Sequence, residues 1–210
     1  MGRLIIAGAG AFAREVLIWA NDIQNKKKVW DEIGFIDDTK MDLLEYGISN
    51  KIVSTIIGYR PCPEDSLVCA IGDTKGKMKV YQYLKGIGGK FTNLIHPSAI
   101  VSDQAILGNG VILSPFTIVS SNVTIGDCVT LNSYSAVGHD SMVKTGCTIS
   151  AHCNVMGNVV LEEGVFLGGS AVIIPKITIQ KDAVVGAGSV VIRNVREGIT
   201  VFGNPAVKIN

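Results

Sequence analysis

Residues 107–142 divide into six consecutive hexads, LGNGVI, LSPFTI, VSSNVT, IGDCVT, LNSYSA and VGHDSM. Every hexad opens with Leu, Ile or Val, and the same six-residue step continues to Val191. The fifth residue of each hexad is small or β-branched throughout. A helix is excluded, because its 3.6-residue period would drift out of phase with this repeat within two hexads. Repeated hexapeptides are typical of a solenoid, and in particular of a parallel β-helix.

This repeat predicts where the side chains lie. Three hexads form one triangular coil, in which the aliphatic residue points inward and the small residue fits near a corner. One coil cannot bury its own interior, so neighbouring coils must stack. The fifteen hexads from Leu107 to Val191 make about five coils, and Ile95 and Val101 extend the register towards the N-terminus. Cys147 and Cys153 occupy the column of small residues, so we expect them to fill corners rather than to form a disulfide or a metal site.

Composition narrows the class of protein. A chain of 210 residues with a net charge of +1 suits two modest domains, and it carries no Lys/Arg stripe that would indicate nucleic acid as a partner. No apolar run is long enough to span a bilayer. Met1 leads directly into a predicted strand rather than a signal peptide, and the free cysteines suit a reducing compartment, so we expect a cytoplasmic protein.

Before the repeat, the pattern is that of alternating strands and helices. The run RLIIAG at 3–8 predicts a buried strand, which a glycine turn joins to a helix that begins near residue 11. Further strands are predicted at 33–36, 66–72 and 91–95, with a basic-faced helix at 75–84. Residues 1–95 therefore form a small α/β domain of four or five strands. This is half of a full dinucleotide-binding fold, which argues against NAD as a cofactor.

Two acidic residues follow the second predicted strand, Asp37 and Asp38. Carboxylates at this end of a strand commonly hold a ribose or sugar hydroxyl, but a solvated pair of turn residues fits the spacing equally well. The glycine turn at Gly8 and Gly10 is a weak motif, because the dinucleotide fingerprint would have a third Gly at position 13, where this chain has Ala. The fingerprint also accepts Ala there, so the motif neither confirms nor excludes a cofactor.

Chemistry within the repeat centres on His139 and Asp140, which fall in a turn of the predicted coil. Histidine is suited to accept a proton near neutral pH, and a neighbouring carboxylate can fix its tautomer and increase its basicity. A solvated turn histidine is the competing interpretation. His96 and His152 favour structural roles. We find no Ser/His/Asp order, no context for a cysteine nucleophile and no metal-ligand spacing, so no metal is expected.

Across nearly its whole length the chain resembles the PglD/NeuD-type bacterial sugar acyltransferases. The motifs that carry the resemblance are IIAGAGAFAREV, GFIDD, CAIGD, NLIHPSA, LNSYSAVGHD, the GN at 157–158, FLGGSAVIIP, VVGAGSVV and FGNPA. The resemblance implies a small Rossmann-like parallel sheet at 1–95, followed at 96–210 by a left-handed parallel β-helix with a C-terminal cap. It also implies a homotrimer with active sites between subunits.

The same resemblance implies roles for individual residues. His139 would be the general base that deprotonates the acceptor as it attacks acetyl-CoA, and Asp140 would increase its basicity. Asn132 would lie near the reacting sugar. The residues implied to bind the nucleotide-linked sugar in the N-terminal domain are Gly10, Ala11, Phe12, Asp37, Asp38 and Gly72. Those implied along the acetyl-CoA groove are Thr148, Gly157, Gly169, Ala187 and Pro205.

Departures from the family pattern bear on the substrate. The GHG of the family is Ala11-Phe12-Ala13 in this chain, Thr148 replaces a histidine near acetyl-CoA, and His152 stands where the family often has Gly. The resemblance implies acetyl-CoA-dependent N-acetylation of a UDP- or dTDP-linked 4-amino-dideoxy sugar for surface glycan synthesis. O-acetylation of a sugar such as sialic acid is the nearest alternative. A non-catalytic β-helix that binds nucleotide sugars is an alternative of another class.

Overall fold

The computed structural model describes residues 2–209 and divides the chain into two compact units, Met1–Pro97 and Ser98–Asn210. The N-terminal unit contains a parallel sheet in the order β3-β2-β1-β4. Its strands are β1 (Arg3–Ala7), β2 (Glu32–Ile36), β3 (Ile52–Ser54) and β4 (Ser66–Cys69). The central strand β1 is buried from Leu4 to Ala7, as its continuous apolar run predicts.

Two helices and a short 3₁₀ turn complete this unit: α1 (Ala11–Lys26), α2 (Thr74–Gly86) and η1 (Leu44–Tyr46). The helix α1 buries Ala13, Val16, Leu17 and Ala20, which recur at the helical period. The Asp73 carboxylate caps α2 by accepting a hydrogen bond from the Gly76 N–H. The predicted strand at 91–95 is only partly formed, with one parallel bridge between Leu67 and Phe91 and a two-residue strand β5 (Leu94–Ile95).

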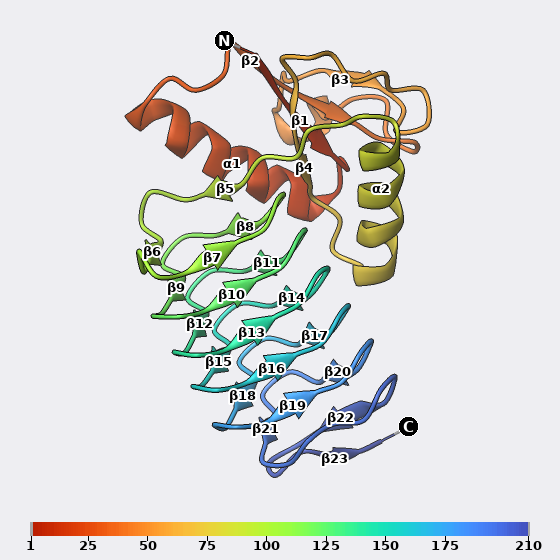
Figure 1. Ribbon diagram of the computed structural model, residues 1–210. Helices are drawn as coiled ribbons and strands as arrows, with labels where there is room; N and C mark the ends of the chain where they lie inside the picture. Colours follow the sequence, from red (N-terminus) through yellow and green to blue (C-terminus); the bar gives the residue numbers. More distant parts are fainter. Residues whose placement is uncertain (1, 210) are drawn as a thin grey trace. The chain divides into compact units, whose positions relative to one another are not determined.

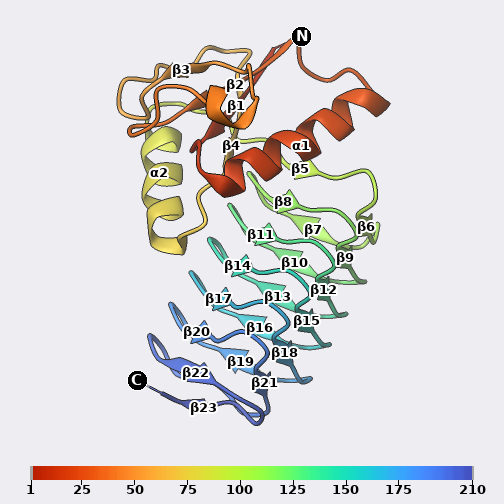
Figure 2. The same ribbon diagram turned by 180° about the vertical axis from the view of Figure 1, so that it is seen from behind.

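The second unit is a parallel β-solenoid with three faces, shown from opposite sides in Figures 1 and 2. The first face consists of β6 (Ile100–Val101), β9 (Ile118–Val119), β12 (Ala136–Val137), β15 (Asn154–Val155), β18 (Val172–Ile173) and β21 (Val190–Val191). The second consists of β7 (Ile106–Leu107), β10 (Thr124–Ile125), β13 (Met142–Val143), β16 (Val160–Leu161) and β19 (Thr178–Ile179). The third contains β8 (Ile112–Leu113), β11 (Thr130–Leu131), β14 (Thr148–Ile149), β17 (Phe166–Leu167), β20 (Val184–Val185), β22 (Thr200–Phe202) and β23 (Val207–Lys208).

Strand pairing confirms the predicted register. Val137 pairs with Val155 and Leu131 with Ile149, so each coil is 18 residues long, which is three hexads. All aliphatic positions from Leu113 to Val191 are buried, and only Leu107, at the N-terminal end of the repeat, is half-buried. The fifth position of every hexad is buried as well, from Val111 to Ser189. The core of the solenoid is therefore the column of aliphatic residues that the period identified.

Each corner of the solenoid turns on a residue in the left-handed backbone region. The fourth residue of each hexad, from Gly110 to Gly188, has a positive φ between 54° and 77°. Only four of these fourteen residues are glycine, and four more are the Asn and Asp residues that tolerate this conformation best. We call the corner between the first and second faces corner A (120–123, 138–141, 156–159 and 174–177). The corner between the third and first faces is corner B (114–117, 132–135, 150–153, 168–171 and 186–189).

The C-terminal segment ends the repeat with a hairpin. The strand β22 pairs in parallel with β20 through Val184 and Thr200, and β23 turns back to pair antiparallel with β22. The turn lies at Gly203, Asn204 and Pro205. Phe202 lies against Gly186 of the preceding coil, where a Cβ would come 2.3 Å from the ring.

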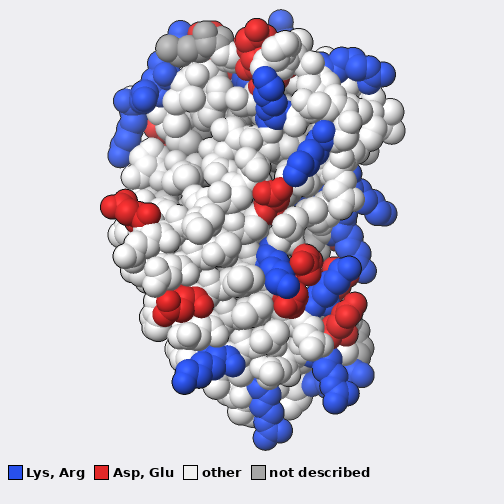
Figure 3. Space-filling view, in the orientation of Figure 1, with Lys and Arg blue, Asp and Glu red and all other residues white. Residues whose placement is uncertain are grey.

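The surface charges are mixed in sign, and the helices are short. On the face shown in Figure 3, Lys and Arg side chains are interspersed with Asp and Glu. Within residues 2–209, neither helix is long and apolar enough to cross a membrane.

Candidate active site

His139 and Asp140 lie together at corner A, between β12 and β13. The Nδ1 atom of His139 is 2.7 Å from Asp140 Oδ2. The hydrogen bond from His139, followed by one from Asn122, lowers the pKa of Asp140, so this carboxylate is ionised at neutral pH and can only accept. Nδ1 therefore carries the ring proton, and the lone pair of the neutral imidazole is on Nε2. The His139 side chain is 62% exposed, so its ring is open to solvent at this corner.

Gly157 lies one coil beyond His139, beneath its imidazole ring. A Cβ placed on Gly157 would come 2.6 Å from His139 Nε2 and 2.7 Å from Cε1. The ring thus occupies the space that any other residue at this position would fill. Of the residues that the resemblance assigned, His139, Asp140 and Gly157 are the three that the structure brings together at corner A.

Corner A is held from both sides by the backbone ladder. The Asp140 N–H donates to Ser121 O at 3.0 Å, and the Asn158 N–H donates to His139 O at 2.9 Å. The Ser141 hydroxyl donates to Met156 O at 3.0 Å and accepts from the Val159 N–H at 3.1 Å. These bonds place the backbone of the His139–Asp140 pair rigidly although both side chains reach solvent.

In the N-terminal unit, the predicted sugar-binding residues gather where the parallel strands end. The Asp37 carboxylate follows β2 and accepts hydrogen bonds from the N–H groups of Ala9, Thr39 and Lys40. Burial would raise the pKa of Asp37, but these hydrogen bonds outweigh it and lower the pKa. Gly8 has a φ of +103°, and its missing Cβ allows the turn to approach Ala70 O.

The neighbouring acid, Asp38, accepts from the Ile56 N–H at 2.8 Å and so anchors the loop after β3. Both carboxylates therefore hold the loops at this edge of the sheet by accepting hydrogen bonds from backbone N–H groups. Neither a sugar-binding pair nor a solvated turn pair, the two interpretations of the sequence, anticipated this role. Gly10 and Gly72 have open space where a Cβ would project. Ala11 begins α1, and the Phe12 ring lies edge-on against Trp19 at 5.9 Å.

The remaining assigned residues lie elsewhere in the solenoid unit. Asn132 is at corner B, at the other end of β12 from His139, and its Oδ1 is buried without a hydrogen-bond partner within the described chain. Gly169 and Ala187 lie at corner B two and three coils further on. Thr148 is a buried residue of β14, and Pro205 is in the C-terminal turn. Within one chain the assigned residues of this unit are thus divided between corner A and corner B, with Thr148 and Pro205 outside both corners.

Corner B also carries a stack of aromatic rings that the sequence analysis missed. Phe116, Tyr134 and His152 occupy the left-handed position of three successive coils, and each adjacent pair of ring centroids is 5.0 Å apart. All three side chains are exposed. The sequence contained the information that predicts this stack, because the three residues are 18 positions apart, which is the length of one coil. His152 therefore has a stacking role, whereas His96 lies 3.3 Å from Asp22 of α1.

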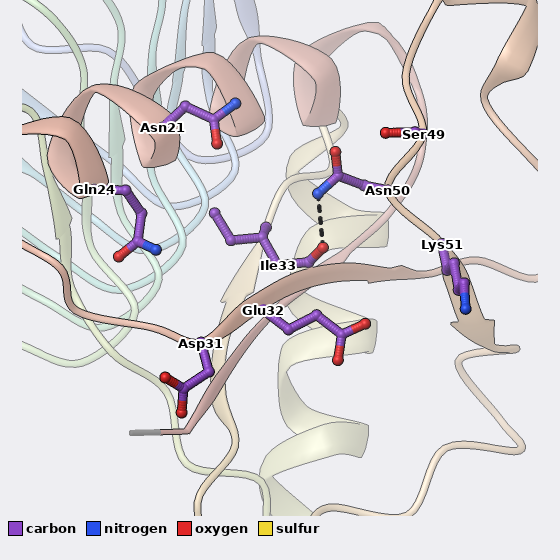
Figure 4. A pocket seen from close by; sticks show the side chains of 8 residues that line it. All are labelled: Asn21, Gln24, Asp31, Glu32, Ile33, Ser49, Asn50 and Lys51. Atoms are coloured by element: carbon purple, nitrogen blue, oxygen red, sulfur yellow. Dashed lines mark hydrogen bonds between the residues drawn. The ribbon is translucent and has the colours of Figure 1, made fainter.

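A cavity of about 360 Å³ in the N-terminal unit is shown in Figure 4. The Asn50 side chain crosses it to donate a hydrogen bond to Ile33 O at 2.8 Å. None of the assigned binding residues lines this cavity, which lies where β2 begins rather than where it ends. Its lining residues are Asn21, Gln24, Asp31, Glu32, Ile33, Ser49, Asn50 and Lys51.

Two of the cysteines, Cys147 and Cys153, pack inside corners of the solenoid, as the sequence predicts. Cys147 and Cys153 are buried, and their thiols donate to the carbonyls of Glu162 and Gly168 in the next coil. Burial raises the pKa of Cys153 to about 11. Across residues 2–209, no group of three or more His, Cys, Asp and Glu side chains is arranged to hold a metal ion.

Comparison with known proteins adds to this geometry. Residues 3–84 match the PglD N-terminal domain. No curated protein matches the chain in sequence. Among solved structures, the acetyltransferase domain of PglB from Neisseria gonorrhoeae FA1090 superposes with a TM-score of 0.92 at 25% identity, covering 100% of both chains. The same domain is also known in complex with acetyl coenzyme A.

Two other proteins are similar over their full length. The perosamine N-acetyltransferase PerB from Caulobacter crescentus, in complex with CoA and GDP-perosamine, has a TM-score of 0.88 at 28% identity, covering 100% of this chain and 98% of PerB. WeeI from Acinetobacter baumannii AYE has a TM-score of 0.88 at 26% identity, covering 100% of both chains. This chain therefore consists of a PglD N-terminal domain followed by a parallel β-solenoid, the arrangement that its resemblance to PglD-type sugar acyltransferases predicts.

Proposed function

We propose that this protein is an acetyl-CoA-dependent N-acetyltransferase that acts on a nucleotide-linked amino sugar. The observation that carries the proposal is the His139–Asp140 pair, whose 2.7 Å hydrogen bond leaves Nε2 of a solvent-exposed ring to act as the base. The full-length similarity to an acetyltransferase that binds acetyl coenzyme A and to one that binds CoA and GDP-perosamine supports the donor and the class of acceptor.

In the proposed reaction, His139 Nε2 removes a proton from the sugar amine as the nitrogen attacks the thioester carbonyl of acetyl-CoA. The tetrahedral intermediate then collapses, the C–S bond breaks, and the His139 imidazolium gives the proton to the sulfur, so that CoA leaves as a thiol and the base is regenerated. Asp140 keeps the ring proton on Nδ1 and stabilises the imidazolium that forms. Transfer is direct, without a covalent enzyme intermediate. A positioned general base contributes roughly a hundred-fold to ten-thousand-fold to the rate.

The distribution of the assigned residues supports a homotrimer with sites between subunits. His139 and Gly157 lie at corner A, whereas Asn132, Gly169 and Ala187 lie at corner B. Corner A of one subunit facing corner B of the next would complete a site that a single chain leaves divided. In this arrangement Gly169, Ala187, Thr148 and Pro205 would line the acetyl-CoA groove.

The acceptor would bind through the edge of the N-terminal sheet at Gly10, Ala11 and Phe12, with Asp37, Asp38 and Gly72. Because Asp37 and Asp38 already accept hydrogen bonds from the surrounding backbone, their main contribution is to shape this edge, while the open space at Gly10 and Gly72 leaves room for the nucleotide. Ala11-Phe12-Ala13 would set the preference for one nucleotide or sugar.

The test is thiol release from acetyl-CoA with a panel of acceptors. The panel contains GDP-perosamine, UDP- and dTDP-linked 4-amino sugars, and free and CMP-linked sialic acid. We expect release with one amino sugar and loss of at least a hundred-fold in kcat for His139→Ala, with CoA affinity retained. Release with the hydroxyl acceptors alone would establish O-acetylation instead. Nucleotide-sugar binding without release from any acceptor would favour a non-catalytic binding protein.

A further inference from the structure

Asn122 lies at corner A one coil before Asp140, and its side chain reaches the carboxylate that holds His139. The Asn122 Nδ2 donates to Asp140 Oδ1 at 3.2 Å, while Asp140 Oδ2 accepts from His139 Nδ1. The two oxygens of one carboxylate are thus engaged on opposite sides. We propose that Asn122 is a positioning residue that orients Asp140, and through it the tautomer and direction of the His139 ring.

The backbone of the solenoid enforces this contact. Asn122 and Asp140 occupy the same left-handed position in successive coils, with φ values of 56° and 59°, so their side chains start from equivalent points of two stacked corners. The Asp140 N–H bond to Ser121 O fixes the separation of the two coils at this point. An Asn at this position therefore meets the carboxylate without a change in backbone conformation.

Asparagine also suits the chemistry of this position. Its amide donates to one carboxylate oxygen without adding charge, whereas an Asp would repel Asp140 and a Lys would compete with His139 for it. Without a donor on Oδ1, the exposed Asp140 carboxylate could rotate, because a single hydrogen bond to Oδ2 does not fix its plane. A rotated carboxylate would release His139 Nδ1 and let the ring leave the space above Gly157.

The orientation of the His139 ring matters because of where the ring lies relative to Gly157. The ring atoms nearest to the missing Cβ of Gly157 are Nε2 and Cε1, so the edge that carries the base lies over bare backbone. The chain Asn122–Asp140–His139 therefore directs Nε2 over Gly157, where the next coil carries no side chain. This inference rests on the proposed function, because it assigns Asn122 to the site that carries out that reaction.

Asn122→Gly is the first variant to test, because glycine accepts the positive φ and the substitution removes only the amide side chain. Asn122→Asp keeps the size of the side chain and removes the donor. Asp182→Gly is the matched control, since Asp182 has a left-handed φ of 54° at a different corner.

The first measurement is the ¹⁵N NMR spectrum of the histidine rings in the full-length protein, with His139 assigned by comparison with His139→Ala. We expect the Nδ1-protonated tautomer to dominate for His139 in the wild type and in Asp182→Gly, and the two tautomers to mix in both Asn122 variants. This readout does not require an acceptor, so it tests Asn122 independently of the proposed reaction. An unchanged His139 tautomer in both variants would overturn the proposal.

The second measurement is steady-state kinetics with the acceptor found in the panel. Loss of one hydrogen bond to a solvent-exposed charged group predicts a fall in kcat of about ten-fold in Asn122→Gly, with the KM for acetyl-CoA unchanged. A rise in that KM with kcat preserved would show that Asn122 acts on the donor rather than on the base, and would contradict the proposal. An altered tautomer in a protein that acetylates no acceptor would keep Asn122 as a positioning residue and refute the proposed function alone.

Discussion

Substitution of Gly157 by Ala tests the geometry at corner A most directly. The new Cβ would lie 2.6 Å from His139 Nε2, whereas ordinary contacts begin at 3.4 Å, so the ring has to retreat by about 0.8 Å. A displacement of this order at a reacting group costs roughly a hundred-fold in rate. The ring is 62% exposed and can swing into solvent, and Gly157 has no positive φ, so we expect little change in stability.

The assay is thiol release from acetyl-CoA, measured beside CoA affinity and the thermal midpoint of unfolding. We expect kcat to fall about a hundred-fold in Gly157→Ala while the midpoint stays near the wild-type value. Gly86→Ala is the matched control, because no atom lies within 4 Å of the Cβ that it would add.

A second comparison separates catalysis from folding at the same corner. A Cβ on Gly138 would lie 2.7 Å from the backbone nitrogen of Gly157, which cannot move without breaking the ladder. Gly138→Ala should therefore lower the unfolding midpoint, whereas Gly157→Ala should not. Near-normal turnover in Gly157→Ala would show that Nε2 does not act from above this glycine. A parallel loss of CoA affinity would refute displacement of the base as the cause and would favour the place in the acetyl-CoA groove that the resemblance implies for Gly157.

Three further outcomes concern the folded state. Val155→Asp would place a charge in the fully buried aliphatic column, costing several kcal/mol, and should yield no folded protein by circular dichroism. Burial would raise the pKa of Asp65, but hydrogen bonds led by that from Arg3 outweigh it and hold the pKa below 3.8. The stability that this depressed pKa contributes is present above pH 3.8 and is lost as pH falls through the folded-state pKa, so urea unfolding should show Asp65→Asn destabilised at pH 7 and closer to wild type at pH 3. With a thiol reagent at pH 8, mass spectrometry should show exposed Cys62 modified and Cys153, whose pKa burial raises to about 11, modified only after unfolding; native labelling of Cys153 would contradict the packing of its corner.

Sequence periodicity determined most of the solenoid. A parallel coil repeats its environment every 18 residues, so each aliphatic residue such as Val137 or Val155 meets the same neighbours and leaves a regular trace in the sequence. The first strands and helices of the N-terminal unit were predicted for a similar local reason, since their apolar patterns follow the strand and helix periods. The length of the strand at 91–95 was overestimated, because an apolar run does not show whether a neighbouring strand is available for pairing.

The left-handed corners were only partly visible in the sequence. Gly, Asn and Asp recur at the fourth position of the hexads, but Phe116, Tyr134 and His152 occupy it too, because stacking across successive coils offsets the backbone strain. Asp140 belongs to this same column of left-handed residues. An Asp at this position therefore tolerates the positive φ of the corner and also accepts the hydrogen bond from His139.

The sequence by itself determined that this protein is a small α/β domain followed by a hexapeptide solenoid, and its resemblance to PglD-type sugar acyltransferases implied that His139 and Asp140 are the reactive pair. Only the tertiary structure decided that Asn122 contacts Asp140, that the imidazole lies over Gly157, and that Asp37 and Asp38 bond to the surrounding backbone. Local patterns record whether a residue faces the core, because burial repeats with the period of the element. They do not record which side chains meet across coils or between loops, because those contacts depend on the register in which distant segments stack.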